Sequence, residues 1–312
     1  MKAMDKSYDL IIIGSGPAGL SASIYASRYG IKHAIIGQIL GGQISEAHLI
    51  DNYPGIENLT GAELGKKLGE HAKKYGAEII PGLVKNIKKE EEGRFIAELE
   101  NNEALKTKTV LLATGMKRRK LDILGEKEFA GKGVSYCATC DGFFYKNKTV
   151  GVIGGSNSAA GAALYLADIC KKVYIIYRKS ELRCEPFWAD SIKKNEKIEV
   201  IYNTNVVKIS GQEKLERVEL DNPHKNSSLL EISGLFIEAG SDPYINYADD
   251  LDIKSDKDGY IKIKSDGSTS VPGIFAAGDI TDGSNKFRQV ITAAAEGAIA
   301  VRSVFNYLKA KS

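Results

Sequence analysis

The chain has 312 residues, of which 43% are hydrophobic and 27% charged, and its formal net charge is +3. These values are typical of a globular protein of about two domains and give no support for nucleic-acid binding. No stretch approaches the roughly 18 apolar residues of a membrane span, and the apolar run before Gly14 is too short for a signal peptide, so the sequence predicts a cytoplasmic protein. Four cysteines in a chain of this length are not a disulfide scaffold, so a close cysteine pair indicates redox chemistry or a metal.

The N-terminal segment YDLIIIGSGPAGLSASIYASRYG predicts a buried strand, a glycine turn and a helix. Leu10–Ile13 is a continuous apolar run, and Pro17 suits the first turn of a helix. Two alternating runs on either side of EEGR, Val84–Lys89 and Arg94–Leu99, predict a hairpin or meander. The other elements expected here are strands in KHAII, AEII and KTVLLATG and a helix over Gly61–Tyr75.

The pattern of strand, glycine turn, small-residue helix and strand restarts at Lys148. Two nucleotide-binding βαβ units in one chain predict an α/β fold with two Rossmann-like domains. Two further strands lie in GLFIEAG and GIFAAGD, and a final helix over Gln289–Leu308 is expected to pack onto the first unit. The expected crossings between the domains are Gly115–Gly133 and Gly240–Tyr247.

The first glycine turn fills every glycine of the GxGxxG pattern. It follows a strand and opens a helix, which is the context that a dinucleotide site requires. The three glycines allow the tight turn, the close approach of a pyrophosphate and close helix–strand packing, and the helix N-terminus offers free N–H groups to the anion. The residues of the turn are Gly14, Ser15, Gly16, Pro17, Ala18 and Gly19.

The second strand of this first unit lacks the acid that usually binds a ribose. Ile36 is followed by Gly37 and Gln38, neither of which is acidic. Because the acid is typical of NAD sites, its absence favours FAD in the first unit.

The second turn departs from the pattern, because Ser156 stands where the middle glycine is expected. If this serine has a positive φ, the strain costs about 1–3 kcal/mol. The turn consists of Gly154, Gly155, Ser156, Asn157, Ser158 and Ala159.

Three cations follow the second unit's strand: Arg178, Lys179 and Arg183. Cations at this position favour the 2′-phosphate of NADP, whereas an acid would favour NAD. Each charge-assisted hydrogen bond is worth roughly 1.5–3 kcal/mol, so two of them offset the serine. The alternative is that the three side chains are solvated surface charges.

The stretch SYCATCDGFFY places Cys137 and Cys140 two residues apart, with Asp141 directly after them. A zinc site normally needs a second cysteine or histidine pair, and a staple closing so short a loop would stabilise little. A dithiol can cycle with little movement, and Asp141 stands where protons enter and leave. The pattern therefore favours a redox switch over a metal site or a staple.

The chain resembles the low-molecular-weight thioredoxin reductases along nearly its whole length. The resemblance rests on IIIGSGPAGLSASIYASR, GGQISEAHLIDNYPG, LLATG, GKGVSYCATCDGFFYKNKTVGVIGG, GIFAAGDITD and FRQVITAAAEGAIA. CATCDGFFY just before the second nucleotide unit is highly specific, since larger glutathione-reductase-like enzymes carry their redox pair near the N-terminus. The resemblance implies transfer of electrons from NADPH to FAD, to the Cys137–Cys140 disulfide, and on to a thioredoxin or glutaredoxin-like protein disulfide.

The resemblance also implies roles for individual positions. Cys140 is the flavin-side sulfur, Cys137 attacks the partner disulfide, and Asp141 is the acid/base. The positions that resemble FAD contacts, besides the first turn, are Gly37, Gln38, Gly41, Gly42, Gln43, Asn52, Thr114, Gly115, Gly278, Asp279, Arg288, Gln289 and Val290. The positions that resemble NADPH contacts are the second turn and the cations Arg178, Lys179 and Arg183, with Gly161 where a glutamate is often found.

The family fold implies an FAD domain built from residues 1–116 and 248–312, with an inserted NAD(P)H domain, residues 117–247, that carries the cysteine pair. A homodimer and a hinge motion about the two linkers are expected with it. NADH or reduced ferredoxin is the alternative donor, and a non-catalytic redox or nucleotide sensor is the alternative function. No metal, nucleic-acid or membrane partner is expected.

Smaller features allow two interpretations each. The basic run Lys117–Lys120 is either a solvated linker or a docking patch for an acidic redox protein or the cofactor phosphates. Cys170 and Cys184 are interpreted as packed thiols, and Phe143–Tyr145 as either core or partner-facing residues.

Overall fold

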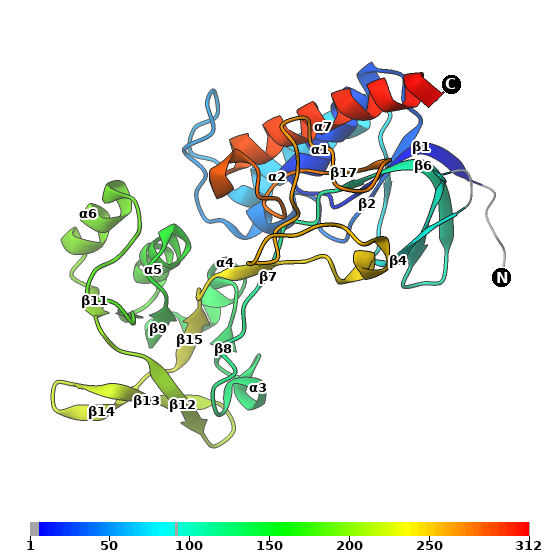
Figure 1. Ribbon diagram of the computed structural model, residues 1–312. Coiled ribbons are helices and arrows are strands. Elements are labelled where there is room, and N and C mark those ends of the chain that lie inside the picture. The colour runs from blue at the N-terminus through cyan, green and yellow to red at the C-terminus, as the bar shows by residue number, and fades with distance from the viewer. Residues whose placement is uncertain (1–5, 91–92, 312) are drawn as a thin grey trace. The chain divides into compact units, whose positions relative to one another are not determined.

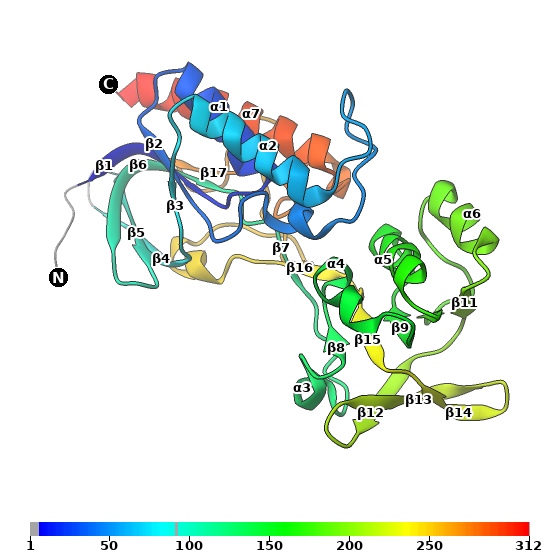
Figure 2. The same ribbon diagram turned by 180° about the vertical axis from the view of Figure 1, so that it is seen from behind.

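The computed structural model describes residues 6–90 and 93–311. Some of the predicted segments include residues 1–5, 91, 92 or 312, and that part of each segment lies outside the described residues. The chain divides into two compact units (Figures 1 and 2). The first consists of Met1–Ser45, Ile50–Lys117 and Asp242–Ser312, and the second of Glu46–Leu49 and Arg118–Ser241.

A seven-stranded sheet forms the centre of the first unit. Its strands are β1 (Ser7–Ile13), β2 (His33–Ile36), β3 (Glu78–Ile80), β4 (Val84–Lys89), β5 (Phe95–Leu99), β6 (Ala104–Leu112) and β17 (Ile274–Ala276). The order is β3-β2-β1-β6-β5-β4, with β17 also paired to β6. β1, β2, β3, β6 and β17 pair in parallel, whereas β4 and β5 form an antiparallel extension. The predicted hairpin is therefore confirmed at β4 and β5.

Three helices, α1 (Pro17–Arg28), α2 (Gly61–Lys74) and α7 (Val290–Lys311), lie together over one face of this sheet (Figures 1 and 2). α1 and α7 can pack closely because their contact is made of small residues: a Cβ on Gly297 would lie 2.1 Å from the Ala18 carbonyl oxygen. Between the helices and the sheet, Leu10 and Ile12 of β1 and Leu20 of α1 are fully buried. Burial of each such side chain stabilises the fold by about 1.5–3 kcal/mol.

The start of α2 shows why its sequence forms a helix there. Thr60 accepts a hydrogen bond from the Glu63 N–H, and the Glu63 carboxylate accepts one from the Thr60 N–H. This capping box satisfies two N–H groups that the first helical turn would leave unpaired.

The second unit contains a five-stranded parallel sheet and a separate antiparallel sheet. The parallel strands, in order across the sheet, are β11 (Ile198–Ile201), β10 (Lys172–Ile176), β9 (Thr149–Ile153), β15 (Gly234–Ile237) and β8 (Val134–Ser135). The antiparallel strands are β12 (Val206–Gly211), β13 (Leu215–His224) and β14 (Ser227–Glu231). The helices are α3 (Glu126–Phe129), α4 (Ala138–Asp141), α5 (Asn157–Ile169) and α6 (Pro186–Lys194). Parallel sheets combined with helices confirm the predicted α/β class.

Two short strands, β7 (Met116–Arg118) and β16 (Ser241–Pro243), pair with each other where the chain passes between the units. Short 3₁₀ helices occupy Gly42–Glu46, Gly142–Tyr145, Asn246–Leu251 and Ser284–Lys286. In the part of the chain that the structure describes, no helix is long and apolar enough to cross a membrane.

Candidate active site

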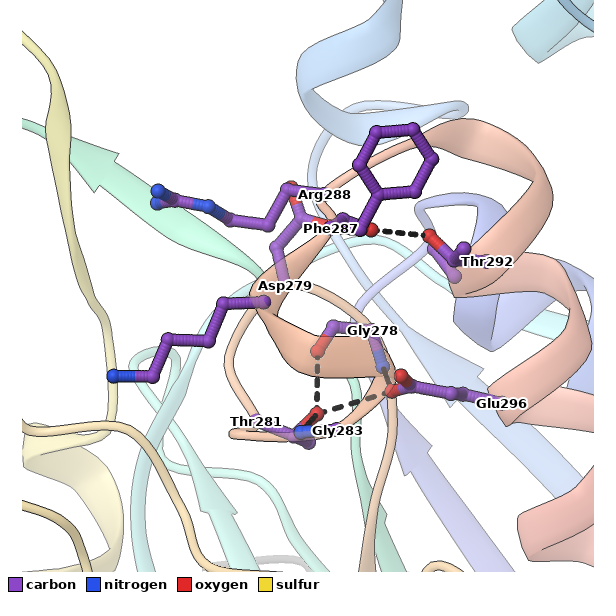
Figure 3. A pocket seen from close by; sticks show the side chains of 10 residues that line it. Gly278, Asp279, Thr281, Gly283, Phe287, Arg288, Thr292 and Glu296 are labelled. Atoms are coloured by element: carbon purple, nitrogen blue, oxygen red, sulfur yellow. Dashed lines mark hydrogen bonds between the residues drawn. The ribbon is translucent and has the colours of Figure 1, made fainter.

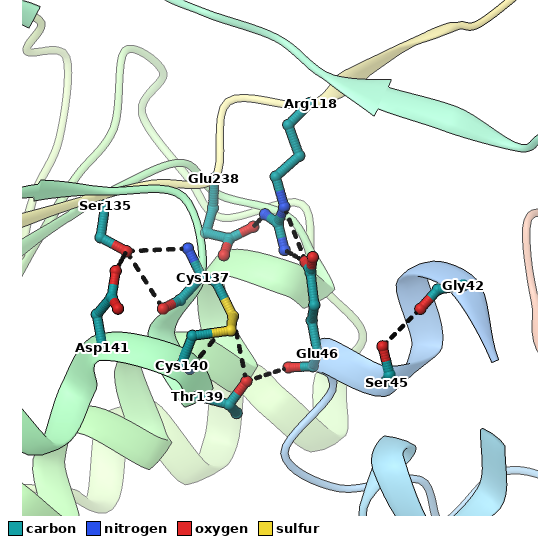
Figure 4. The surroundings of a disulfide bond; sticks show 10 residues. All are labelled: Gly42, Ser45, Glu46, Arg118, Ser135, Cys137, Thr139, Cys140, Asp141 and Glu238. Atoms are coloured by element: carbon teal, nitrogen blue, oxygen red, sulfur yellow. Dashed lines mark hydrogen bonds and ion pairs between the residues drawn. A yellow bond between two sulfur atoms is a disulfide. The ribbon is translucent and has the colours of Figure 1, made fainter. Parts of the chain in front are cut away.

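Cys137 and Cys140 form a disulfide at the start of α4, directly after β8 (Figure 4). Their Cα atoms are 5.3 Å apart. Cys137 is half-buried and Cys140 is exposed, so the pair lies at the surface of the second unit. The Cys137 sulfur also accepts a hydrogen bond from the Cys140 N–H at 3.2 Å, which fixes it at the N-terminus of the turn.

Ser135 connects the disulfide to Asp141. Its hydroxyl donates to the Asp141 Oδ2 atom at 2.6 Å and accepts from the Cys137 N–H at 3.1 Å (Figure 4). Ser135 is buried at the end of β8, so the hydroxyl is fixed by the sheet. One hydroxyl thus positions both the backbone of a redox cysteine and the carboxylate predicted to exchange protons.

A cationic side chain lies between two acids on the other side of the disulfide. Arg118 pairs with Glu238 at 2.7 Å, and two of its nitrogens contact the Glu46 carboxylate (Figure 4). Burial alone would lower the pKa of Arg118, but the two carboxylates outweigh it and raise the pKa. Burial raises the pKa of Glu238, and Arg118 opposes that rise.

The backbone carbonyl of Glu46 is connected to the cysteine pair through the side chain of Thr139. Its carbonyl accepts a hydrogen bond from the Thr139 hydroxyl at 2.7 Å, and that hydroxyl lies 3.4 Å from the Cys137 sulfur (Figure 4). The rings of His48 and Tyr165, 4.6 Å apart between centroids, give this segment a second contact within the same unit.

The basic run Lys117–Lys120 is not one uniform patch. Arg118 is bound by acids as described, and the Lys117 ammonium lies 5.3 Å from the centre of the Tyr244 ring. The interpretation of the whole run as a solvated linker is therefore wrong at Arg118, which is only partly exposed.

In the second glycine turn, Ser156 has φ −94° and ψ 179°. This is extended backbone that any residue adopts, so the strain considered for a positive φ does not arise. The positive φ in this turn belongs to Gly154, at +143°. A Cβ on Gly155 would lie 2.5 Å from the Tyr177 ring, which explains the second glycine.

The start of α5 is open to an anion. Ser156 is its N-cap and makes no side-chain capping bond, so N–H groups of the first turn are available. Asn157 instead exchanges hydrogen bonds with Glu185. Ser158 is exposed in the first turn.

Arg178, Lys179 and Arg183 follow β10, the strand after this helix. All three are exposed, and within residues 6–90 and 93–311 their side chains make no hydrogen bond or ion pair. The Arg183 N–H donates to the Gly155 carbonyl at 2.8 Å, which places this cation beside the glycine turn. The arrangement fits a phosphate group near the turn, because both the cations and the helix N–H groups remain available.

The first glycine turn is a crowded backbone cradle at the start of α1. Gly14 has φ +115°, and a Cβ there would lie 2.2 Å from the Ala113 carbonyl oxygen. A Cβ on Gly42 would lie 3.1 Å from the Gly16 Cα, so glycine backbones face each other. α1 has Gly16 as N-cap and no side-chain cap. This cradle fits the pyrophosphate of FAD.

Neighbouring predicted FAD positions join the same turn. Ser15 is buried and donates to the Ile39 carbonyl at 2.7 Å, and a Cβ on Gly37 would collide with its hydroxyl. Gly41 is bonded to the turn, because its N–H donates to the Ser15 carbonyl at 2.8 Å. Gln38 and Gln43 are exposed nearby in the chain.

A hollow beside the N-terminus of α7 contains Asp279 and Arg288 (Figure 3). Burial raises the pKa of Asp279 to about 6, with Arg288 lowering it and Glu296 adding to the rise. The Asp279 carboxylate accepts no hydrogen bond from any part of the chain that the structure describes. A half-buried, unpartnered carboxylate fits the hydroxyl groups of a ribityl chain.

The loop that carries Asp279 is bound to α7 through Glu296. The Glu296 carboxylate accepts from the Gly278 N–H at 2.8 Å and the Thr281 hydroxyl at 3.0 Å (Figure 3). It also accepts from the Ser284 hydroxyl at 2.6 Å. Glu296 therefore fixes the position of the loop.

Asn52 and Gln289, predicted from separate motifs, meet directly. The Asn52 amide donates to the Gln289 Oε1 atom at 2.9 Å, although the residues are 237 positions apart. Val290 begins α7 next to them. Thr114 adjoins the first glycine turn, because a Cβ on Gly14 would lie 3.0 Å from the Thr114 backbone nitrogen. Its hydroxyl donates to the Tyr244 carbonyl at 2.8 Å and lies 2.7 Å from the Tyr247 hydroxyl, and Gly115 follows it with φ +63°.

The remaining cysteines differ from the disulfide pair. Cys170 is buried, and burial raises the pKa of its thiol to about 11. Cys184 is partly exposed, with a pKa raised mainly by burial. The packing interpretation is confirmed for Cys170. Phe143 and Phe144, directly after Asp141, are 72% and 71% exposed, so neither is a core residue.

Comparison with known proteins decides the family. The family described as pyridine nucleotide-disulphide oxidoreductase matches residues 8–297. A thioredoxin reductase of Bacillus subtilis (strain 168) is 38% identical over 308 residues, which cover 98% of this chain and 96% of the relative. The chain belongs to the thioredoxin reductases of this family.

Solved structures agree with this assignment. Lactococcus lactis thioredoxin reductase matches with a TM-score of 0.92 at 36% identity, covering 97% of this chain and 99% of that chain. The T. acidophilum thioredoxin reductase matches with a TM-score of 0.91 at 38% identity, covering 99% and 100%. The predicted resemblance and the two Rossmann-like domains are therefore confirmed. As a member of this family, the protein is a flavoprotein disulfide oxidoreductase, and the sensor alternative is not favoured.

Four residues around the predicted sites were not among those predicted from the sequence: Ser135, Glu238, Glu46 and Glu296. Ser135 carried no signal beyond its place two residues before Cys137. Glu238 did carry one, since it is a lone acid at the end of the apolar run GLFI; such an acid must have a partner if it is buried. The other two, Glu46 and Glu296, could not be found from their neighbours in the chain.

Proposed function

We propose that this thioredoxin reductase uses NADPH to reduce the disulfide of a thioredoxin or glutaredoxin-like protein. The observation that carries the proposal is the exposed Cys137–Cys140 disulfide with Asp141 hydrogen-bonded beside it. Exposed Phe143 and Phe144 adjoin the pair in sequence, and an apolar surface next to a redox pair suits a protein substrate.

The two units have separate proposed roles. The first would hold FAD through the cradle around Gly14, Gly16 and Gly42 and through Asp279 and Arg288. The second would hold the nicotinamide cofactor at the turn from Gly154 to Ser158. Bound FAD would supply two-electron transfer between the nicotinamide and the disulfide.

The proposed work of the cysteines and Asp141 follows from thiol–disulfide exchange. Two electrons and two protons convert the disulfide to two thiols, with Cys140 as the flavin-side sulfur. The Cys137 thiolate attacks one sulfur of the partner disulfide, and the other partner sulfur leaves with the electron pair. The Cys140 thiolate then attacks the Cys137 sulfur, which releases the second partner thiolate and restores the enzyme's disulfide. Asp141 exchanges protons with the sulfurs during these steps.

NADPH is proposed over NADH and reduced ferredoxin because the side chains of Arg178, Lys179 and Arg183 have no ion-pair partner among the described residues. The backbone of Arg183 is also bonded to the turn at Gly155. A monoanionic or dianionic 2′-phosphate would gain charge-assisted hydrogen bonds there, which NADH cannot form. Mixing the oxidised enzyme anaerobically with each donor tests this. Rapid loss of the flavin's visible absorbance with NADPH alone is expected, and equally rapid loss with NADH or ferredoxin would contradict it.

We also propose a cytoplasmic homodimer whose second unit moves about hinges where the chain crosses between the units, near Lys117 and Ser241. The free thiols of Cys170 and Cys184 are consistent with a reducing compartment. The dimer and the hinge follow from the family resemblance. Sedimentation of the FAD-loaded protein tests the dimer, and an engineered cross-link between the units tests the hinge, because unchanged turnover after locking would exclude the motion.

A further inference from the structure

Thr139 is the side chain that lies between the disulfide and the Glu46 segment. Its hydroxyl oxygen is 3.4 Å from the Cys137 sulfur and donates to the Glu46 carbonyl at 2.7 Å (Figure 4). The hydroxyl is therefore within hydrogen-bond distance of two acceptors.

The carbonyl that Thr139 contacts is fixed. The side chain of the same residue, Glu46, is bound by Arg118, and Arg118 is bound at 2.7 Å by the buried Glu238. The tilted rings of His48 and Tyr165, 4.6 Å apart between centroids, add a contact two residues further along. Thr139 thus meets a constrained backbone oxygen, so its rotation has two defined end points.

A threonine hydroxyl has one hydrogen and can donate to only one acceptor at a time. A disulfide sulfur is a weak acceptor, so in the oxidised pair the hydrogen goes to the carbonyl. A thiolate is charged, and hydrogen bonds to charged acceptors are roughly twice as strong as neutral ones. Reduction of the disulfide therefore changes the preferred acceptor of the Thr139 hydrogen from the Glu46 carbonyl to the Cys137 sulfur.

We propose that Thr139 is a further catalytic residue, whose hydroxyl turns from the Glu46 carbonyl to the Cys137 thiolate once the disulfide is reduced. It joins the Cys140 N–H, which already donates to that sulfur at 3.2 Å. The inference rests on the proposed role of Cys137 as the attacking sulfur. The hydroxyl keeps its proton throughout: Cys137 forms the new S–S bond, and the partner's other sulfur leaves with the electrons of the broken bond.

The proposal predicts a particular signature in thiolate reactivity. Losing one charge-assisted bond should make the Cys137 thiolate about tenfold less populated below its titration midpoint. The more basic thiolate that remains is also about threefold more nucleophilic, because reactivity rises with basicity. Without the hydroxyl, the alkylation rate of Cys137 should fall about threefold at low pH and rise about threefold on the high-pH plateau.

The test measures iodoacetamide alkylation of Cys137 by peptide mapping, across pH, in the dithiothreitol-reduced, FAD-loaded protein. Thr139→Val keeps the shape and removes the hydroxyl, Thr139→Ser restores a hydroxyl, and Thr149→Val at the start of β9 is the matched control. In Thr139→Val the alkylation rate of Cys137 should lie below the parent's at low pH and above it on the high-pH plateau. The midpoint of this pH profile should be about one pH unit higher than in the parent. Thr139→Ser and Thr149→Val should follow the parent.

Two results would overturn the proposal. If Thr139→Val matches the parent profile, the hydroxyl does not reach the thiolate. If Thr139→Val and Thr139→Ser lower the rate equally at every pH, Thr139 has only a packing role. A third result would instead contradict the proposed function itself. If Cys137 is not the attacking sulfur, its alkylation in the reduced parent should be no faster than that of Cys184.

Discussion

The Ser135 hydroxyl donates a hydrogen bond to the Asp141 carboxylate at 2.6 Å, across the turn that holds the disulfide. Because Ser135 is buried at the end of a sheet strand, it gives the carboxylate a fixed direction. The hydrogen bond ties Asp141 to the sheet of the second unit, although the acid itself lies at the end of a four-residue helix.

Ser135→Ala should lower turnover with an oxidised thioredoxin by about threefold to tenfold. General acid–base catalysis contributes about 10²- to 10⁴-fold, and a mispositioned carboxylate loses part of it. Flavin reduction by the nicotinamide should be unchanged, which separates this effect from misfolding. Ser191→Ala on α6 is the matched control, and an equal loss in both variants would refute the positioning role.

Arg178→Gln and Arg183→Gln should each raise the KM for NADPH by about tenfold, because each removes a charge-assisted bond to the 2′-phosphate. The KM for NADH should stay within about twofold. Steady-state kinetics with both donors provides the measurement, with Arg217→Gln on β13 as control. Parallel increases for NADPH and NADH would show that these cations do not recognise the phosphate.

Ser156→Gly should not stabilise the protein. The serine has extended backbone at φ −94°, so glycine relieves no strain and costs about a few tenths of a kcal/mol at an N-cap. Urea unfolding of both proteins with excess FAD measures the difference. A gain above about 1 kcal/mol would mean that the turn is strained after all.

The fold was predictable where local patterns determine it. The two glycine turns, the alternating strands β4 and β5 and the small residues of α1 have signals within a few neighbouring residues. The site contacts were less predictable because they join distant residues. Arg118 contacts Glu46, which is 72 positions earlier in the chain, and Glu238, which is 120 positions later. Nothing in the basic run distinguishes Arg118 from its neighbours, so only the buried acid at the end of β15 could have indicated the pair.

The buried His33 should make stability depend on pH. Burial lowers the pKa of His33 below its ordinary value of 6.5, although its bond to the Ile31 carbonyl opposes this. Below pH 6.5 the unfolded chain binds a proton that the folded chain does not, so this contribution is complete above pH 6.5 and is lost as the pH falls. The loss has a limiting slope of about 1.4 kcal/mol per pH unit.

Urea midpoints from pH 8 to pH 5, measured with excess FAD, test the His33 effect. His33→Gln should have a shallower decline than the parent, whereas His71→Gln, an exposed substitution on α2, should decline as the parent does. Equal slopes in the parent and His33→Gln would contradict the assignment.

We propose that electrons reach the protein substrate through Cys140 and then Cys137. The most direct measurement is NADPH-dependent reduction of an oxidised thioredoxin by Cys140→Ser, alongside Cys184→Ser. We expect Cys140→Ser to keep rapid flavin reduction and to lose transfer to thioredoxin, while Cys184→Ser works at the parent's rate. If Cys140→Ser reduced thioredoxin as fast as the parent, the disulfide would not be on the electron path.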